Sequence, residues 1–168
     1  MTQCGVVKYA PLERCMGDDA LHVLPTIRVL QEWETCVALK LIINMPIRNV
    51  ARSTAFWQAL GYAFDARYAS DSVCSLILGD DMIAMLHEDA GFVANTDRAI
   101  ADPHTTTEAI ISIAVPTRAD VDATMTKALA HGAREFGSGA DHGFIYHRSF
   151  VDLDGHQWEV FWMDATAA

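Results

Sequence analysis

The feature that most constrains the fold of this chain is an order of predicted elements that occurs twice. Residues 38–47 form a predicted strand, followed by a helical pattern that ends at Gly61. Residues 108–115 form another predicted strand, followed by a helical pattern that ends at Gly132. Because the period is much longer than that of a solenoid repeat, it indicates a duplicated half-domain.

Each predicted helix is followed by short predicted strands, at residues 62–68, 73–78 and 82–87 in the first half and at residues 133–136, 143–151 and 156–163 in the second. Turns are predicted between them, among them residues 137–139 and 152–155. We therefore expect one domain at residues 39–165, with modules 39–88 and 108–165. Residues 89–107 form a polar connector with a helical turn expected near Phe92, and residues 1–38 form an extension of unknown role, with a short helix expected at 26–36.

The last predicted strand alternates in a way that assigns its two faces. Trp158, Val160 and Trp162 fall on one face, and Gln157, Glu159 and Phe161 on the other. A carboxylate among apolar neighbours needs a partner, a metal ion, a ligand or a proton. Glu159 is therefore a candidate functional residue, and the alternative is an edge-strand glutamate that faces water.

Composition and charge exclude several classes of function. The 168 residues are 51% hydrophobic and 20% charged, as expected of an ordinary globular domain. A net charge of -10 would repel a phosphate backbone, so we expect no nucleic-acid partner and favour a neutral or cationic small molecule. The longest apolar stretch, residues 37–47, is too short to span a membrane. The four cysteines have no C-x-x-C spacing and no secretory signal is evident, so we expect a cytoplasmic protein.

Two segments resemble motifs of a known superfamily. Residues 53–61 read Ser-Thr-Ala-Phe-Trp-Gln-Ala-Leu-Gly and resemble the S-x-x-F-[YW]-x-x-L-G helix of the vicinal oxygen chelate superfamily, which includes glyoxalase I, bleomycin-resistance proteins and extradiol dioxygenases. Residues 149–159 read Ser-Phe-Val-Asp-Leu-Asp-Gly-His-Gln-Trp-Glu and are similar to its F-x-D-P-D-G-x-x-x-E segment, with Leu153 where proline is usual. The likeness covers roughly residues 41–163.

The resemblance implies an α+β fold in which two paired βαβββ modules form a curved mixed sheet around a cleft, with the helices on the outer face, and it implies a homodimer. It also implies four metal-ligand positions, which in this sequence hold Ile42, Met85, Ile110 and Glu159. Isoleucine offers no donor atom and methionine is a soft ligand, so Glu159 is the only one of the four suited to a hard divalent ion.

Three functional hypotheses follow. The first is a protein that binds a small organic molecule without a cofactor, with Glu159 as polar anchor, residues 89–107 as a flap, and an apolar lining of Ile42, Met85, Ile110 and Phe161. The second is a lactoylglutathione lyase-like or dioxygenase-like enzyme with a divalent metal on a rearranged ligand set of Asn44, His87, Ser112 and Glu159. The third is a metal-free enzyme with Glu159 as base beside Arg148 or His87.

Strand alternation leaves one orientation open. If Tyr146 and Arg148 point into the cleft, Arg148 can pair with Glu159 or bind a substrate oxygen; if they point outward, His147 takes the cleft side. His156, at the edge of a turn, is expected to be exposed to solvent.

Overall fold

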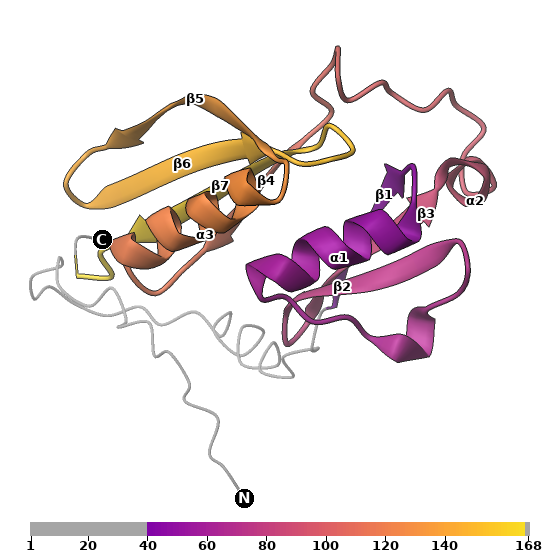
Figure 1. Cartoon of the computed structure of the whole chain (residues 1–168), viewed down its shortest axis with the longest axis horizontal. Helices are drawn as coiled ribbons and strands as arrows, with labels where there is room; N and C mark the ends of the chain where they lie inside the picture. Colours follow the sequence, from indigo (N-terminus) through magenta and orange to yellow (C-terminus); the bar gives the residue numbers. More distant parts are fainter. Residues whose placement is uncertain (1–39, 167–168) are drawn as a thin grey trace, which may run out of the picture. The chain divides into compact units, whose positions relative to one another are not determined.

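Two mixed β-sheets, each covered on one face by a long helix, make up the computed structural model, which describes residues 40–166 (Figure 1). These residues belong to one compact unit, Ala38–Ala168. The predictions for residues 1–38, including the short helix at 26–36, lie outside the described residues. No helix within residues 40–166 has the length and apolar character needed to cross a membrane.

The first sheet contains β1 (Leu41–Ile47), β2 (Val73–Gly79) and β3 (Met82–Glu88) in the order β1-β3-β2. β1 runs parallel to β3, and β2 runs antiparallel to β3. The helix α1 (Val50–Leu60) connects β1 to the rest of this module.

The strand predicted at residues 62–68 is wrong. Its only sheet contact is an isolated bridge between Phe64 and Leu76, and a 3-10 helix occupies Ala66–Tyr68. Asp65 explains the turn, because its carboxylate accepts a hydrogen bond of 3.0 Å from the Arg67 backbone N–H and forms a salt bridge with the Arg67 guanidinium. The first module therefore has three strands where four were expected.

The second sheet contains β4 (Ile110–Ala114), β5 (Arg134–Asp141), β6 (Ile145–Val151) and β7 (Gln157–Met163) in the order β4-β7-β6-β5. The turn predicted at residues 137–139 is wrong, because these residues lie inside β5. Gly137 and Gly139 have φ of 71° and 66°, and the pairing register shifts between Phe136 and Ala140. The glycines thus produce a bulge in the strand.

The predicted helix ends are confirmed. The Asn49 side chain accepts a hydrogen bond from the Arg52 backbone N–H at the start of α1, and Gly61 ends α1 with φ 103°. Thr117 and Asp120 form a complete capping box at the start of α3 (Arg118–Ala130). The helical turn predicted near Phe92 is α2 (Asp89–Val93), in the connector between the modules.

Both modules contribute to one hydrophobic core. The indole rings of Trp57 on α1 and Trp158 on β7 lie edge to face with their centroids 4.5 Å apart, and Phe150 on β6 packs on the same tryptophan at 6.2 Å. All three side chains are buried. The two helices, α1 and α3, also pack against each other. Two mixed sheets with a helix on one face of each confirm the predicted α+β fold class (Figure 1).

Candidate functional site

Each sheet has a face that carries no helix, which we term the open face. In the first sheet the core-facing positions are Ile43, Met45, Ala84 and Leu86. The alternate positions, which lie on the open face, include four predicted site residues: Ile42, Asn44, Met85 and His87. Ile42 is 51% exposed.

In the second sheet the same alternation separates the core from the site. Trp158 and Val160 are buried in the core, as predicted for β7. The open face carries the other predicted site residues: Ile110, Ser112, Glu159 and Phe161. The register pairs Ser112 with Glu159 across β4 and β7, so the two side chains lie next to each other.

Arg148 lies on the opposite face from Glu159. Its guanidinium binds Asp122 of α3 at 3.0 Å and Glu135 of β5 at 2.6 Å. Tyr146, two residues earlier, also donates to Asp122, at 2.8 Å. Of the two orientations left open by the sequence, the structure therefore has the one in which Arg148 faces α3 and His147 takes the open face.

A chain of three polar side chains crosses the open face of the second sheet. The Ser112 hydroxyl donates a hydrogen bond of 3.0 Å to Oε1 of Glu159. Nδ1 of His147 lies 3.1 Å from Oε2 of the same carboxylate. This contact is close but not well aligned, because the buried Nδ1 atom does not meet hydrogen-bond geometry. His147 and Glu159 remain partly open to solvent, with side chains 28% and 27% exposed.

A second polar pair lies on the open face of the first sheet. Nε2 of His87 lies 3.0 Å from the amide oxygen of Asn44. Burial lowers the pKa of His87 from its ordinary value, because the charged imidazolium loses solvation. His87 is consequently neutral near pH 7, and its ring donates its Nε2 proton to Asn44.

An apolar cavity of about 640 Å³ lies between the edges of the two sheets. Its first wall comes from Leu41 and Ile43 of β1 with Leu78 and Met82, and its second wall comes from residues 109–114 with Phe161 of β7. Three predicted site residues, Ile110, Ser112 and Phe161, line this cavity. Glu159 adjoins it through its hydrogen bond to Ser112. The other predicted residues (Ile42, Asn44, Met85, His87, Arg148) are outside its lining.

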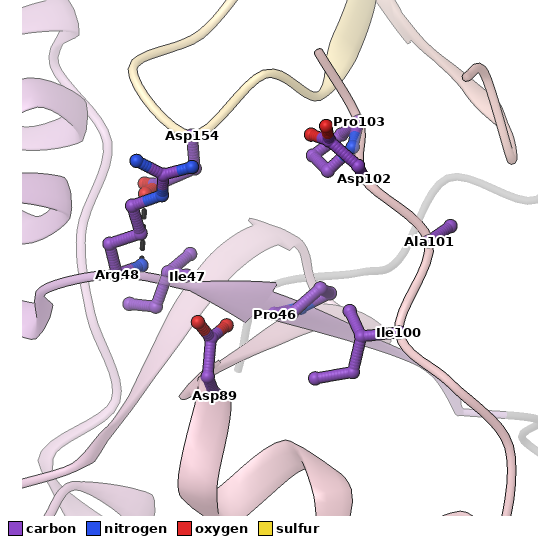
Figure 2. Close-up of a pocket in the computed structure, with 9 residues that line it drawn as sticks. All are labelled: Pro46, Ile47, Arg48, Asp89, Ile100, Ala101, Asp102, Pro103 and Asp154. Atoms are coloured by element: carbon purple, nitrogen blue, oxygen red, sulfur yellow. Dashed lines mark hydrogen bonds between the residues drawn. The ribbon is translucent and has the colours of Figure 1, made fainter. Parts of the chain in front are cut away.

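A smaller cavity of about 250 Å³ lies where the parallel strands β1 and β3 end (Figure 2). Pro46, Ile47 and Arg48 form one side, Asp89 forms another, and residues 100–103 of the connector close over it together with Asp154. The Arg48 backbone N–H donates to Asp154 at 2.9 Å, as drawn in Figure 2. The connector is thus placed against the end of β1 rather than over the apolar cavity.

The acidic turn of the second motif connects the two modules. The buried Asp154 carboxylate accepts hydrogen bonds from the Arg48 backbone and from the Ser53 hydroxyl at 2.7 Å, and it forms a salt bridge with Arg52. Asp152 accepts a hydrogen bond of 2.8 Å from the Trp158 indole, and burial raises the pKa of its carboxyl. These two carboxylates have structural roles.

The expectation that His156 is exposed is wrong. The residue is only 3% exposed, and its Nε2 lies 2.6 Å from the Pro46 carbonyl oxygen. Its other ring nitrogen lies 3.6 Å from a Glu108 carboxylate oxygen. The turn holds the imidazole against β1 of the other module. The prediction was wrong because it assumed that a turn residue is exposed to solvent.

The four positions implied for a metal ion do not fit one. Ile42 and Ile110 carry no donor atom, and Met85 carries only a thioether, which leaves Glu159 as a lone carboxylate. Residues 40–166 contain no group of three histidine, cysteine, aspartate or glutamate side chains placed to hold an ion. The alternative set divides into two hydrogen-bonded pairs, Asn44 with His87 and Ser112 with Glu159.

His147 is an open-face residue that the sequence left as one of two alternatives. Alternation alone placed either His147 or Arg148 beside Glu159, and the choice depends on the register of β6 against β7. In that register His147 lies opposite Phe161, and Ser149 lies opposite Glu159. The signal that could have resolved the choice is α3, because Asp122 on that helix offers Arg148 a carboxylate on the other face.

Comparison with known proteins gives relatives in structure only. No protein-family model and no curated protein sequence matches the chain. The hypothetical protein SA1046 from Staphylococcus aureus is 19% identical, with a TM-score of 0.65 over 78% of this chain and 98% of that one. A glyoxalase/bleomycin resistance protein/dioxygenase family enzyme from Burkholderia phytofirmans is 15% identical, with a TM-score of 0.61 over 73% and 96%.

The fosfomycin resistance protein FosX from Mesorhizobium loti is also similar, with 15% identity and a TM-score of 0.54 over 77% of this chain and 94% of that one. At such identities the likeness establishes the fold. The fold implied by the predicted resemblance to the vicinal oxygen chelate superfamily is therefore confirmed.

Proposed function

We propose that this protein, built on the vicinal oxygen chelate fold, binds a small organic molecule in the cavity between β1 and β4 without a resident metal ion. The observation that carries the proposal is the cavity itself, whose volume of about 640 Å³ lies within the range of small-molecule sites. Its walls are almost entirely aliphatic or aromatic, so burial of apolar ligand surface would supply most of the affinity.

Ile110 stands at an implied metal-ligand position and also lines the cavity. It occupies a position where the resemblance implies a metal ligand, and instead it lines the apolar cavity with a side chain that is 55% exposed. When a ligand covers an exposed aliphatic side chain at a cavity wall, apolar surface is removed from water, and this stabilises the complex. A substitution that removes a donor atom and adds apolar surface favours an organic guest over an ion.

Glu159 indicates which charge the proposed guest should carry. The carboxylate lies beside the cavity, held by Ser112, and the protein carries a net charge of -10. Both features favour a guest with a positive charge at one end and an apolar body at the other. Glu159 would then be the polar anchor, as predicted from the strand alternation.

Paired dye titrations test this proposal. Thioflavin T, a flat hydrophobic cation whose fluorescence rises when it is immobilised, should bind saturably, whereas the anionic dye anilinonaphthalenesulfonate should bind more weakly. Ile110→Trp fills the cavity and should weaken thioflavin T binding, while Leu129→Trp on the exposed side of α3 should not. Equal binding of both dyes by wild type and Ile110→Trp would contradict the proposal.

Elemental analysis tests the metal-free part of the proposal separately. Protein purified without chelator should contain no stoichiometric zinc, nickel, cobalt, iron or manganese, because one carboxylate is too few ligands to retain such an ion. A stoichiometric transition metal that is lost in Glu159→Gln would instead favour the rearranged ligand set with Asn44, His87 and Ser112.

The homodimer and the cytoplasmic location also remain proposals. β5 lies at the edge of its sheet away from the cavity, where it pairs only with β6 within residues 40–166, and Phe136 on β5 is 45% exposed. A second copy of the chain that covers this edge would protect it from non-specific pairing and leave the cavity between β1 and β4 open. Light scattering should give twice the chain mass of 18.5 kDa, and a monomer at all concentrations would contradict this.

A further inference from the structure

We propose that the open face also catalyses hydrolysis of small activated carbonyl compounds, with Nε2 of His147 as the general base and Glu159 as the residue that positions its imidazole. This activity goes beyond ligand binding in the cavity and does not depend on a cationic guest. It is inferred from the placement of His147 next to Phe161, a residue that lines the cavity, from the carboxylate near Nδ1 of its ring, and from the exposure of that ring to solvent.

The first step concerns placement. His147 lies directly opposite Phe161 in the register of β6 and β7, and both side chains lie on the open face. Directly opposed side chains on one sheet face have Cβ atoms about 4.5–5.5 Å apart. Phe161 lines the apolar cavity, and His147, which is outside that lining, lies next to Phe161 on the neighbouring strand.

The second step concerns the orientation of the ring. Nδ1 of His147 lies 3.1 Å from Glu159 Oε2 and is shielded from solvent. The two atoms are close but not aligned as a hydrogen bond, and a rotation of the ring that points Nδ1–H at this oxygen would favour the tautomer that leaves the lone pair on Nε2. The other oxygen of Glu159 is fixed by Ser112 at 3.0 Å, which restricts rotation of the carboxylate.

The third step concerns what surrounds Nε2. Within residues 40–166, no hydrogen-bond partner occupies this atom, and the His147 side chain is 28% exposed, so water can reach the ring. His142 stacks beside it with ring centroids 6.5 Å apart and an angle of 22° between the planes. The Ser112 hydroxyl is committed to Glu159 and is not directed at His147, so the nucleophile would be water rather than serine.

The reaction balances without a cofactor. Nε2 of His147 takes a proton from a water molecule while the water oxygen forms a bond to the carbonyl carbon of an ester. The tetrahedral intermediate collapses, the bond between the carbonyl carbon and the leaving oxygen breaks, and a carboxylic acid and an alcohol or phenolate are released. The proton on His147 passes to the leaving group or to solvent, which returns the imidazole to its neutral form.

The test uses 4-nitrophenyl acetate as substrate and the full chain as enzyme. Wild type should accelerate hydrolysis above the buffer rate, and His147→Ala should lower kcat/KM about a hundredfold or more, because a positioned general base contributes about 10²–10⁴-fold. Free imidazole added to His147→Ala should restore part of the lost rate. His131→Ala, which removes an exposed histidine at the end of α3, is the matched control and should behave as wild type.

Variants of Glu159 test the positioning role. Glu159→Gln keeps the shape but not the charge, so kcat should fall with little change in KM, and Glu159→Asp should recover part of kcat. A rate in His147→Ala equal to that of wild type, or a loss that imidazole does not restore, would overturn the proposal. Thioflavin T binding distinguishes the two proposals. If His147→Ala still binds the dye but no longer hydrolyses the ester, both proposals are supported. If wild type hydrolyses the ester but does not bind the dye, only the proposed guest is contradicted.

Discussion

The Asp154 carboxylate accepts a hydrogen bond of 2.7 Å from the Ser53 hydroxyl, which lies 101 residues earlier in the chain. Ser53 belongs to α1 of the first module and Asp154 to the acidic turn of the second. The same carboxylate also binds Arg52 and the backbone N–H of Arg48. One side chain thus connects the two sequence motifs that identified the fold.

Replacement of Asp154 should therefore destabilise the whole domain. Asp154→Ala leaves the Ser53 hydroxyl and a backbone N–H without a partner, and the expected loss in the free energy of unfolding is about 3 kcal/mol. Urea denaturation followed by tryptophan fluorescence measures it. Asp71→Ala, at an exposed turn, is the control and should change stability by about 0.5 kcal/mol or less. An equal effect of the two substitutions would contradict the connecting role.

Gly155 should be intolerant of a side chain. It has φ of 101°, and a Cβ atom there would lie 3.0 Å from His104 Nδ1 and 3.1 Å from the Pro103 carbonyl carbon. Gly155→Ala should cost about 1–3 kcal/mol through backbone strain and the displaced connector. Gly91→Ala is the matched control in α2, where a Cβ meets nothing within 4 Å, and it should be neutral or slightly stabilising. Thermal unfolding of both variants checks the difference.

The lowered pKa of His87 predicts a pH dependence of stability. The unfolded chain binds a proton at His87 near the ordinary pKa of 6.5, whereas the folded protein binds it only at lower pH. The unfolded state therefore binds more protons in this window, so stability should decrease as the pH falls below about 6.5. Comparison of wild type and His87→Gln between pH 7.5 and 5 should show a smaller decrease in the variant, and NMR should show titration of the His87 ring below 6.5. A steeper decrease in the variant would contradict the assignment.

Arg148 should matter for stability and not for the site. Its ion pairs with Asp122 and Glu135 are partly exposed, so Arg148→Gln should lower the free energy of unfolding by about 1 kcal/mol. Thioflavin T affinity should stay unchanged, since Arg148 faces α3. Glu159→Gln should show the opposite pattern, with weaker dye binding and little effect on unfolding. If Arg148→Gln weakened binding instead, the assignment of the two strand faces would be wrong.

The fold could be predicted from the sequence because its signals are local. Asn49, Gly61, Thr117 and Gly155 mark helix ends and a turn through their own side chains or φ angles, and each acts as predicted. The alternation of Trp158 with Glu159 fixed the two faces of β7 in the same way. These are properties of a few neighbouring residues, so one sequence is enough to find them.

One error comes from a local bond that was missed in the sequence, and another comes from a contact between distant residues. The strand predicted at 62–68 does not form because Asp65 and Arg67 make a local hydrogen bond. His156 is buried because it contacts Pro46, which lies 110 residues away in the sequence. The side of β6 that faces Glu159 depends on Asp122 in α3. Alternation alone allows either His147 or Arg148 to lie on the same face as Glu159, and the position of α3 decides between the two orientations.

Methyl NMR of the isoleucines tests the central claim most directly. Thioflavin T added to chelator-treated protein should shift the δ-methyl signals of the isoleucines that line the cavity, Ile43, Ile110, Ile111 and Ile113, and leave Ile100 and Ile145 unchanged. Shifts confined to Ile100 would place the guest in the smaller cavity beside Asp102. Shifts that occur only after a divalent metal ion is restored would contradict a metal-free site.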